Sequence, residues 1–233
     1  MTHLVQGLTH MENATNYNDW IFNNINSFLG NRILEVGGGL GIFTERLLDR
    51  EFVATVEIHQ ELAAHLKNKF KDNNINVFQG DICDKDLISN IKDLRIDTVV
   101  CLNVLEHIED DALALSNMNK CLSPNGRLIL FVPALRFLFG AMDKSQHHYR
   151  RYNKNSLKKL VNNMGFSIIK SYYMNSLGVI GWFIFGKIFK RSVVSQRSVL
   201  FYDKYVVPWL SKSESIFHPF IGQSLLLICK KEN

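Results

Sequence analysis

The stretch Arg32-Ile33-Leu34-Glu35-Val36-Gly37-Gly38-Gly39-Leu40-Gly41-Ile42-Phe43-Thr44-Glu45-Arg46-Leu47-Leu48 decides the fold. Residues 33–36 predict a buried strand, the glycines a turn, and residues 42–48 a helix with Ile42, Phe43, Leu47 and Leu48 on its inner side. Glycine allows positive φ and lets the backbone approach a ligand, and the start of a helix offers free N–H groups to that ligand. Four glycines within five residues therefore favour a nucleotide-type site over a tight turn that needs glycine for geometry alone.

The spacing of the glycines separates two kinds of nucleotide site. The dinucleotide fingerprint G-x-G-x-x-G/A fails here, because Ile42 or Thr44 stands where its last small residue should be. The spacing that fits is E-x-G-x-G-x-G, which resembles motif I of the class I S-adenosylmethionine (SAM) dependent methyltransferases. The resemblance implies that SAM is the cofactor and that this segment contributes the following contacts to it: Glu35, Gly37, Gly38, Gly39 and Gly41.

Acidic residues follow the next two predicted strands. Residues 52–56 form the second strand and end at Glu57, 20 residues after Gly37, where a carboxylate can bind two ribose hydroxyls. Residues 75–78 form the third strand, and the resemblance implies that Asp81 binds the adenine amino group. A turn residue or helix cap is the alternative for Asp81. The neighbours expected to contact the cofactor as well are Ile58 and Ile82.

The fourth predicted strand, residues 96–102, is nearly all apolar, as buried parallel strands are. The segment after it looks like the N-V-L-E-H-x-x-D segment of small-molecule class I methyltransferases, which implies that Leu102 and Asn103 lie near the methionine end of SAM. Alternating strands and helices predict an α/β fold, a doubly wound, mostly parallel, seven-stranded Rossmann-like sheet that binds its ligand at the carboxyl ends of the strands.

Four segments make up the expected organisation. Residues 1–30 form an N-terminal helical cap, whose helix spans residues 16–29, and residues 31–173 form the SAM-binding core. Residues 174–221 are a helical insertion rich in apolar and basic residues, and residues 222–233 return as the last strand. The resemblance to methyltransferases covers residues 16–173 together with that strand.

The loop of residues 133–152 carries the candidate general bases. It resembles the V-P-A…D…H-x-R-R-Y loop of a bacterial methyltransferase subgroup often seen beside glycan-assembly enzymes. His148 is the first candidate, because histidine titrates closest to neutral pH, and His147 and Tyr149 are next. The alternative is that the imidazoles hold the loop together by hydrogen bonds.

A divalent metal is a weaker alternative for the same region. Glu106, His107 and a histidine from the later loop match part of an E-x-x-E-H metal motif, but Asn103 replaces its first glutamate. Since Mg²⁺ sites rely on carboxylates, the sequence predicts no metal.

The composition and charge of the chain indicate which kinds of partner to expect. The chain has 233 residues, of which 46% are hydrophobic, and its four scattered cysteines favour a reduced, cytoplasmic protein. Its polar first 15 residues do not resemble a secretory signal. Residues 144–233 carry 15 Lys and Arg against 3 Asp and Glu, which suggests an anionic partner.

Two apolar stretches, residues 177–189 and 199–210, are too short to span a bilayer. They predict either a substrate cover or a surface that docks peripherally on the anionic inner face of the cytoplasmic membrane. The leading function is methyl transfer from SAM to a hydroxyl or amine of a small, glycan-like or lipid-linked acceptor. The alternatives are a ubiquinone-type O-methyltransferase acting on an apolar phenol, and an RNA methyltransferase. Nucleic acid is the less favoured partner, because the basic half is interleaved with apolar runs.

Overall fold

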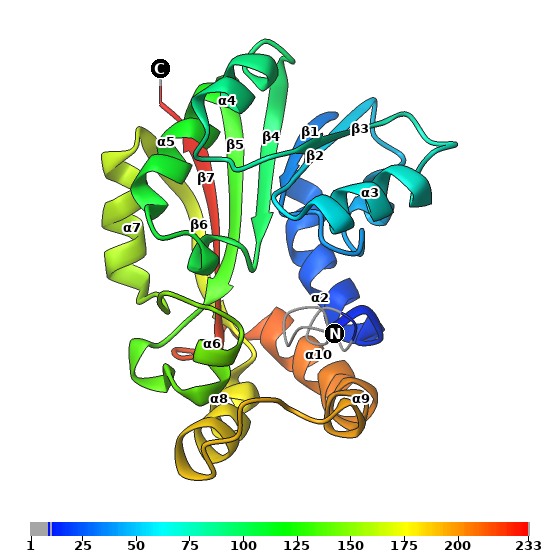
Figure 1. The fold of residues 1–233 in the computed structure, drawn as a ribbon. Helices are drawn as coiled ribbons and strands as arrows, with labels where there is room; N and C mark the ends of the chain where they lie inside the picture. The colour runs from blue at the N-terminus through cyan, green and yellow to red at the C-terminus, as the bar shows by residue number, and fades with distance from the viewer. Residues whose placement is uncertain (1–8, 10, 233) are drawn as a thin grey trace.

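The computed structural model describes residue 9 and residues 11–232, and within them seven strands form one sheet. The strand order is β3-β2-β1-β4-β5-β7-β6 (Figure 1). All pairs are parallel except those made by β7, which runs antiparallel between β5 and β6. The predicted fold class is therefore confirmed. The strands are β1 (Arg32–Val36), β2 (Phe52–Glu57), β3 (Ile75–Gln79), β4 (Ile96–Leu102), β5 (Leu122–Pro133), β6 (Phe166–Met174) and β7 (Ser224–Lys231).

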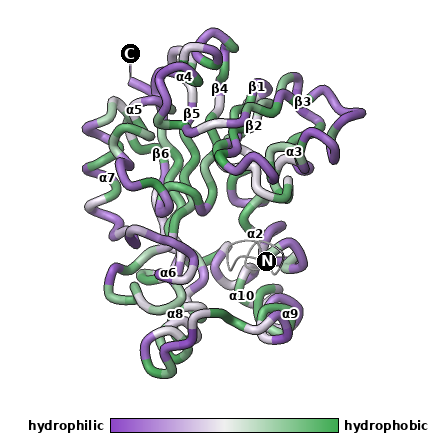
Figure 2. Tube along the Cα trace, viewed as in Figure 1, coloured by the Kyte–Doolittle hydropathy of each residue, from purple (hydrophilic) through white to green (hydrophobic). Residues whose placement is uncertain are grey.

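Helices cover both faces of this sheet. One buried cluster joins the strands to α4 (Lys85–Ile91), α5 (Asp111–Cys121) and α7 (Lys154–Asn163). A second cluster joins the opposite face to α2 (Thr15–Ile25), which contributes the buried Trp20. Figure 2 shows the hydrophobic residues along β4 and β5. Apolar strands buried on both faces explain why the sheet reads as continuous apolar runs in the sequence.

The short elements sit mostly in the connections. They are η1 (Asn26–Phe28), η3 (Leu105–His107), η4 (Arg136–Leu138) and α6 (Ala141–Ser145), while α3 (Gln60–Lys69) joins β2 to β3. Asn125 takes φ +62° in the turn inside β5. Asparagine tolerates this left-handed region. The first part of the predicted 1–30 cap, and most of the segment judged not to be a secretory signal, lie outside the described residues.

The helix predicted directly after the glycine turn is wrong in length. Only a four-residue 3-10 helix, η2 (Thr44–Leu47), forms there, and Leu48, predicted to face inward, is 38% exposed. The chain has only ten residues between Gly41 and the start of β2 at Phe52, so it must turn back at once. A helix this short adds little dipole at the turn, so the backbone N–H groups of the turn itself must carry any anion binding.

The insertion, residues 174–221, folds into four helical elements beyond the carboxyl ends of the strands (Figure 1). They are α8 (Ser176–Trp182), the π-helix η5 (Phe183–Ile188), α9 (Gln196–Tyr205) and α10 (Val207–Ile216). The buried carboxylate of Asp203 accepts the N–H of Tyr17 at 2.8 Å, which fastens α9 to α2. Within the described residues, no helix combines the length and hydrophobicity needed to cross a membrane.

Candidate active site

The glycine loop, residues 37–41, leaves the end of β1 in a conformation that requires glycine. Gly37, Gly39 and Gly41 have φ values of +83°, +54° and +81°. A Cβ atom on Gly37 would also lie 2.2 Å from a methyl carbon of Val104, in the loop after β4. Side chains strain this region of backbone space, so the loop depends on glycine both for its conformation and for its contact with the next loop.

Glu57 organises the glycine loop from the end of β2. Its buried carboxylate accepts the N–H of Gly39 at 2.8 Å and the N–H of His59 at 2.9 Å. A carboxylate has about four acceptor positions, so two contacts leave room for ribose hydroxyls. The adjacent Ile58 is 54% exposed, an apolar side chain open to a ligand at the strand end. These residues fit SAM, and they would hold its adenosine portion, including the ribose.

Glu35 lies below the loop, inside the fold. Its carboxylate accepts the hydroxyl of Thr44 and thereby ties β1 to η2. Burial raises the pKa of Glu35 to about 7, against the opposing effect of the hydrogen bond from Thr44. In the structure, the Glu35 carboxylate therefore fixes the base of the glycine loop through its contact with Thr44.

The remaining predicted cofactor residues divide between surface and core. Asp81 is exposed, and its carboxylate accepts the N–H of Cys83 at 2.8 Å, the turn contact named as its alternative role. Ile82 and Leu102 are buried at 3% and 9% exposure. Asn103 is exposed with φ +53°, and its N–H donates to Phe131 at 2.7 Å.

The sheet register brings these segments to one edge. Val36 pairs with Val56 and with Cys101, and Glu57 pairs with Gln79. The connections after β1, β2, β3 and β4 therefore begin at the same level. The carboxyl edge of a doubly wound sheet is where ligands bind.

In the loop after β5, residues 134–152, His148 contacts the buried carboxylate of Asp143. The Nδ1 atom of His148 lies 3.2 Å from the carboxylate of Asp143, and the two side chains are 6% and 0% exposed. Arg151 donates from Nε to the same carboxylate at 2.6 Å. Burial alone would raise the pKa of Asp143, but His148, Arg151 and the Gly140 N–H together lower it. Asp143 is thus an ionised acceptor, so Nδ1 of a neutral His148 carries the proton and Nε2 is left free.

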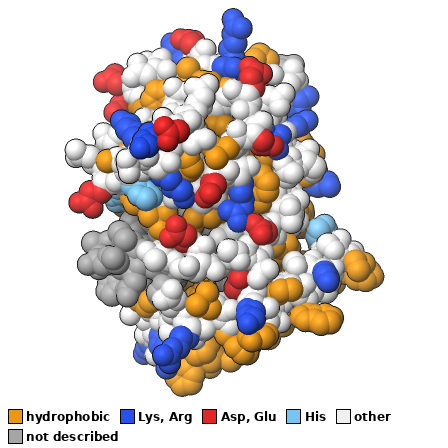
Figure 3. All heavy atoms as spheres, turned by 90° about the vertical axis from the view of Figure 1, so that its right-hand side faces the viewer, with side chains coloured by type: hydrophobic (Ala, Val, Ile, Leu, Met, Phe, Trp, Pro, Cys, Tyr) orange, Lys and Arg blue, Asp and Glu red, His pale blue; other side chains and the backbone are white. Residues whose placement is uncertain are grey.

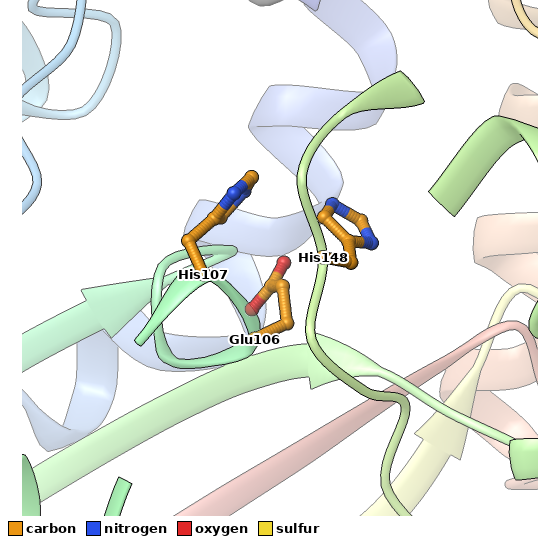
Figure 4. Close-up of side chains that lie close together, drawn as sticks. All are labelled: Glu106, His107 and His148. Carbon is orange, nitrogen blue, oxygen red and sulfur yellow. The ribbon is translucent and has the colours of Figure 1, made fainter. Parts of the chain in front are cut away.

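Glu106 and His107, on η3, meet His148 from the other side. Figure 4 shows the three side chains converging, and their ligand atoms lie within 4.8 Å of one another. The rings of His107 and His148 stand edge to face, 4.6 Å apart. Burial raises the pKa of Glu106 to about 7, and burial together with the nearby histidines lowers the pKa of His107 to about 3. One carboxylate oxygen of Glu106 has no hydrogen-bond partner among the described residues.

This cluster has the donor atoms of a metal site, although the sequence predicted none. A neutral imidazole and a carboxylate are both ligands for divalent cations. The same atoms also suit proton transfer, because a free imidazole nitrogen stands beside a carboxylate that can stabilise its protonated form. The two uses exclude each other at His148, and removal of metal distinguishes them.

The other two base candidates point outward. His147 is exposed, with φ +60°, and Tyr149 is 53% exposed. The N–H of Tyr149 donates to the backbone oxygen of Glu106 at 2.8 Å, so this residue ties the loop to η3 through its backbone. Of the three candidates, His148 is the one that the structure brings to Glu106 and His107.

Three members of the network were absent from the predicted site. Asp143 binds His148, and Arg151 binds Asp143 while its guanidinium carbon lies 4.5 Å from the ring centre of Trp182. Trp182 itself donates to Asp143 at 3.3 Å. The D of the V-P-A…D…H-x-R-R-Y pattern was the available sequence signal for Asp143. No short-range signal marks Trp182, which is 39 residues away.

Comparison with known proteins identifies the class. A family model described as "Methyltransferase domain" matches residues 15–171. Among solved structures, a SAM dependent methyltransferase from Archaeoglobus fulgidus superposes with TM-score 0.60 at 16% identity, covering 92% of this chain and 94% of that one. A putative methyltransferase from Bacillus halodurans gives TM-score 0.59 at 17% identity, covering 88% and 95%. At such identities these structures show the fold.

The curated relatives match this chain over a smaller share of their length. The ubiquinone biosynthesis O-methyltransferase of Coxiella burnetii strain RSA 493 is 24% identical over 137 residues, 53% of this chain and 57% of that protein. The mitochondrial enzyme of the same name from Schizosaccharomyces pombe is 27% identical over 131 residues, 53% and 46%. The matches thus span about half the length of these relatives.

The fold is one that this chain shares with a solved SAM dependent methyltransferase. The family match covers well over half of the chain, and the chain belongs to this methyltransferase family.

Proposed function

We propose that this protein transfers a methyl group from SAM to a hydroxyl group of a small, glycan-like or lipid-linked acceptor, with His148 as the general base. The observation that carries the proposal is the buried pair of Asp143 and His148, held against Glu106 at the same sheet edge as the glycine loop. A histidine fixed by an ionised carboxylate in this way is organised to take a proton from a substrate.

The cofactor, when bound, supplies an electrophilic methyl group. The glycine loop and Glu57 would hold the adenosine portion, and the connections after β4 and β5 lie at the same edge of the sheet. Holding the acceptor and the methyl group aligned can provide roughly 7–11 kcal/mol of the barrier.

The proton of the acceptor is handled by the network around His148. The Nε2 atom takes the hydroxyl proton, and the oxygen lone pair that remains forms the new bond to carbon. Asp143 keeps Nδ1–H oriented and stabilises the imidazolium. Glu106 adds a second carboxylate beside the ring, and its ionised form favours the protonated base.

A phenol acceptor is the second candidate, because the curated relatives carry the name ubiquinone biosynthesis O-methyltransferase. A phenol gives up its proton more readily than a sugar hydroxyl. The phenol reading therefore predicts a smaller loss of turnover when His148 is replaced.

The test uses the purified protein, SAM labelled in its methyl group and cell extract separated into lipid, glycan and RNA fractions. Label in the glycan fraction, or in a lipid that is not of the quinone type, supports the proposal. Label in a quinone-type lipid selects the phenol reading, and label confined to RNA contradicts both.

A further inference from the structure

The insertion, residues 174–221, presents an apolar surface that the rest of the described chain leaves uncovered. Figure 3 shows hydrophobic side chains along the lower edge of the molecule, with Lys and Arg side chains among them. Monomeric proteins rarely expose contiguous apolar patches larger than a few hundred Å². The most exposed members of this insertion surface are Phe189 (62%), Phe201 (63%), Trp209 (80%), Ile216 (73%), Phe217 (80%) and Phe220 (97%).

In the insertion, the acidic side chains are buried and the basic side chains are exposed. Its two acids are buried: Asp203 caps α2, and Glu214 accepts the N–H groups of Asn175 and Ser176 at 2.9 Å, which caps α8. Its Lys and Arg side chains are all exposed, and within the described part of the chain none of them forms an ion pair. The outward charges of Lys and Arg are therefore not offset by any exposed acid of the insertion. These basic residues are Lys187, Lys190, Arg191, Arg197, Lys204 and Lys212.

We propose that the insertion surface docks on an anionic lipid bilayer. Exposed aromatic residues suit the headgroup region, and basic residues beside them are attracted to anionic lipids. A second copy of the chain is a poorer partner, because a two-fold contact through this surface would bring the same uncompensated cations face to face. The positive sign of the exposed charges thus favours an anionic bilayer over a second copy of the chain.

The insertion surface is joined to the His148 network. Trp182 ends α8 and donates to Asp143, while η5, which carries exposed apolar residues, continues directly from it. The bilayer would therefore lie on the side of the molecule where the strands end (Figure 1). This inference stands apart from the proposed function, because its test needs neither SAM nor acceptor.

The test is co-sedimentation of the full chain with vesicles of phosphatidylcholine alone or with added phosphatidylglycerol. We expect binding at least about tenfold stronger to the anionic vesicles, and only partial release when salt rises from about 0.1 M to about 1 M, because screening weakens the charges but leaves the inserted apolar surface. Trp209 is an internal probe, since it is 80% exposed while Trp20 is 6% exposed. Its emission should shift to the blue on binding, and Trp209→Phe should lose most of that shift while the protein still sediments with the vesicles.

Matched variants separate the surface from general stickiness. The double variant Phe217→Ser and Phe220→Ser should lower vesicle binding at least about tenfold. Ile169→Ser, which removes a 45% exposed apolar residue on β6, should leave it unchanged. Circular dichroism confirms that each variant is folded. Absence of binding to both vesicle types, equal losses for the two variants, or self-association that buries Trp209 in the absence of lipid would overturn the inference.

Discussion

The glycine loop after β1 and the His148 loop after β5 lie at the same edge of the sheet, but different interactions fix their conformations. Backbone geometry fixes the first, through positive φ at three glycines and one carboxylate that accepts a loop N–H. Buried charge fixes the second, through Asp143 with its bonds to His148, Arg151 and Trp182. The first loop should therefore fail when a side chain is added, and the second when a charge is removed.

Gly39→Val should cause the largest loss of SAM binding, more than about 100-fold. A β-branched residue is strained at φ +54°, and the shift would displace the N–H that Glu57 accepts. Isothermal titration of the folded variant measures it. Gly181→Val is the control, because among the described residues no atom outside its own stretch of helix lies within 4 Å of a Cβ there. Unchanged affinity in Gly39→Val would remove the glycine loop from the cofactor site.

Arg151→Met should lower the free energy of unfolding by about 3–5 kcal/mol, because it leaves a buried carboxylate without its cation. The neighbouring Arg150→Met breaks the more exposed pair with Asp111 and an exposed hydrogen bond to the backbone oxygen of Glu109, and should cost about 1 kcal/mol or less. Urea unfolding of both variants gives the comparison. Equal losses would mean that the Asp143 network does not stabilise the loop.

Glu35→Gln should change how stability depends on pH. The pKa of Glu35 is raised from 4.5 to about 7 in the folded protein, so folding takes up a proton between those values and wild-type stability falls as pH rises through them. At pH 8 the variant should be more stable than wild type by roughly 3 kcal/mol, with the difference vanishing near pH 4. Thermal unfolding across pH measures it, with the exposed Glu45→Gln as control. A pH-independent difference would contradict the buried, protonated state.

Glu57→Ala should have the smallest effect of the series, a weakening of SAM binding by about 1–3 kcal/mol. The variant loses the contact that orders the glycine loop and the predicted ribose contact together. Glu61→Ala, on the exposed side of α3, should bind SAM as wild type does. A loss of turnover with unchanged SAM affinity would move Glu57 out of the cofactor site.

The same contrast explains what could be predicted from the sequence. Glycine spacing, Glu57 after its strand and the apolar strands are local signals, so the fold and the glycine loop follow from them. The length of η2 could not be predicted, because the turn-back to β2 and the contact between Thr44 and Glu35 limit that helix. The pairing of Asp143 with Trp182 joins segments that only the folded insertion brings together. Roles for the cofactor residues and for His148 stay predictions.

The measurement that tests the account most directly compares His148→Gln with His147→Gln, on protein dialysed against a chelator. Both SAM affinity and single-turnover methyl transfer to the labelled acceptor fraction are determined. We predict that wild type stays active after chelation, and that His148→Gln loses about 10²–10⁴-fold in rate while binding SAM within a few-fold of wild type. The exposed neighbour His147→Gln should match wild type in both. Equal rates for the two variants, or wild-type activity that disappears on chelation and returns with a divalent cation, would contradict His148 as the general base.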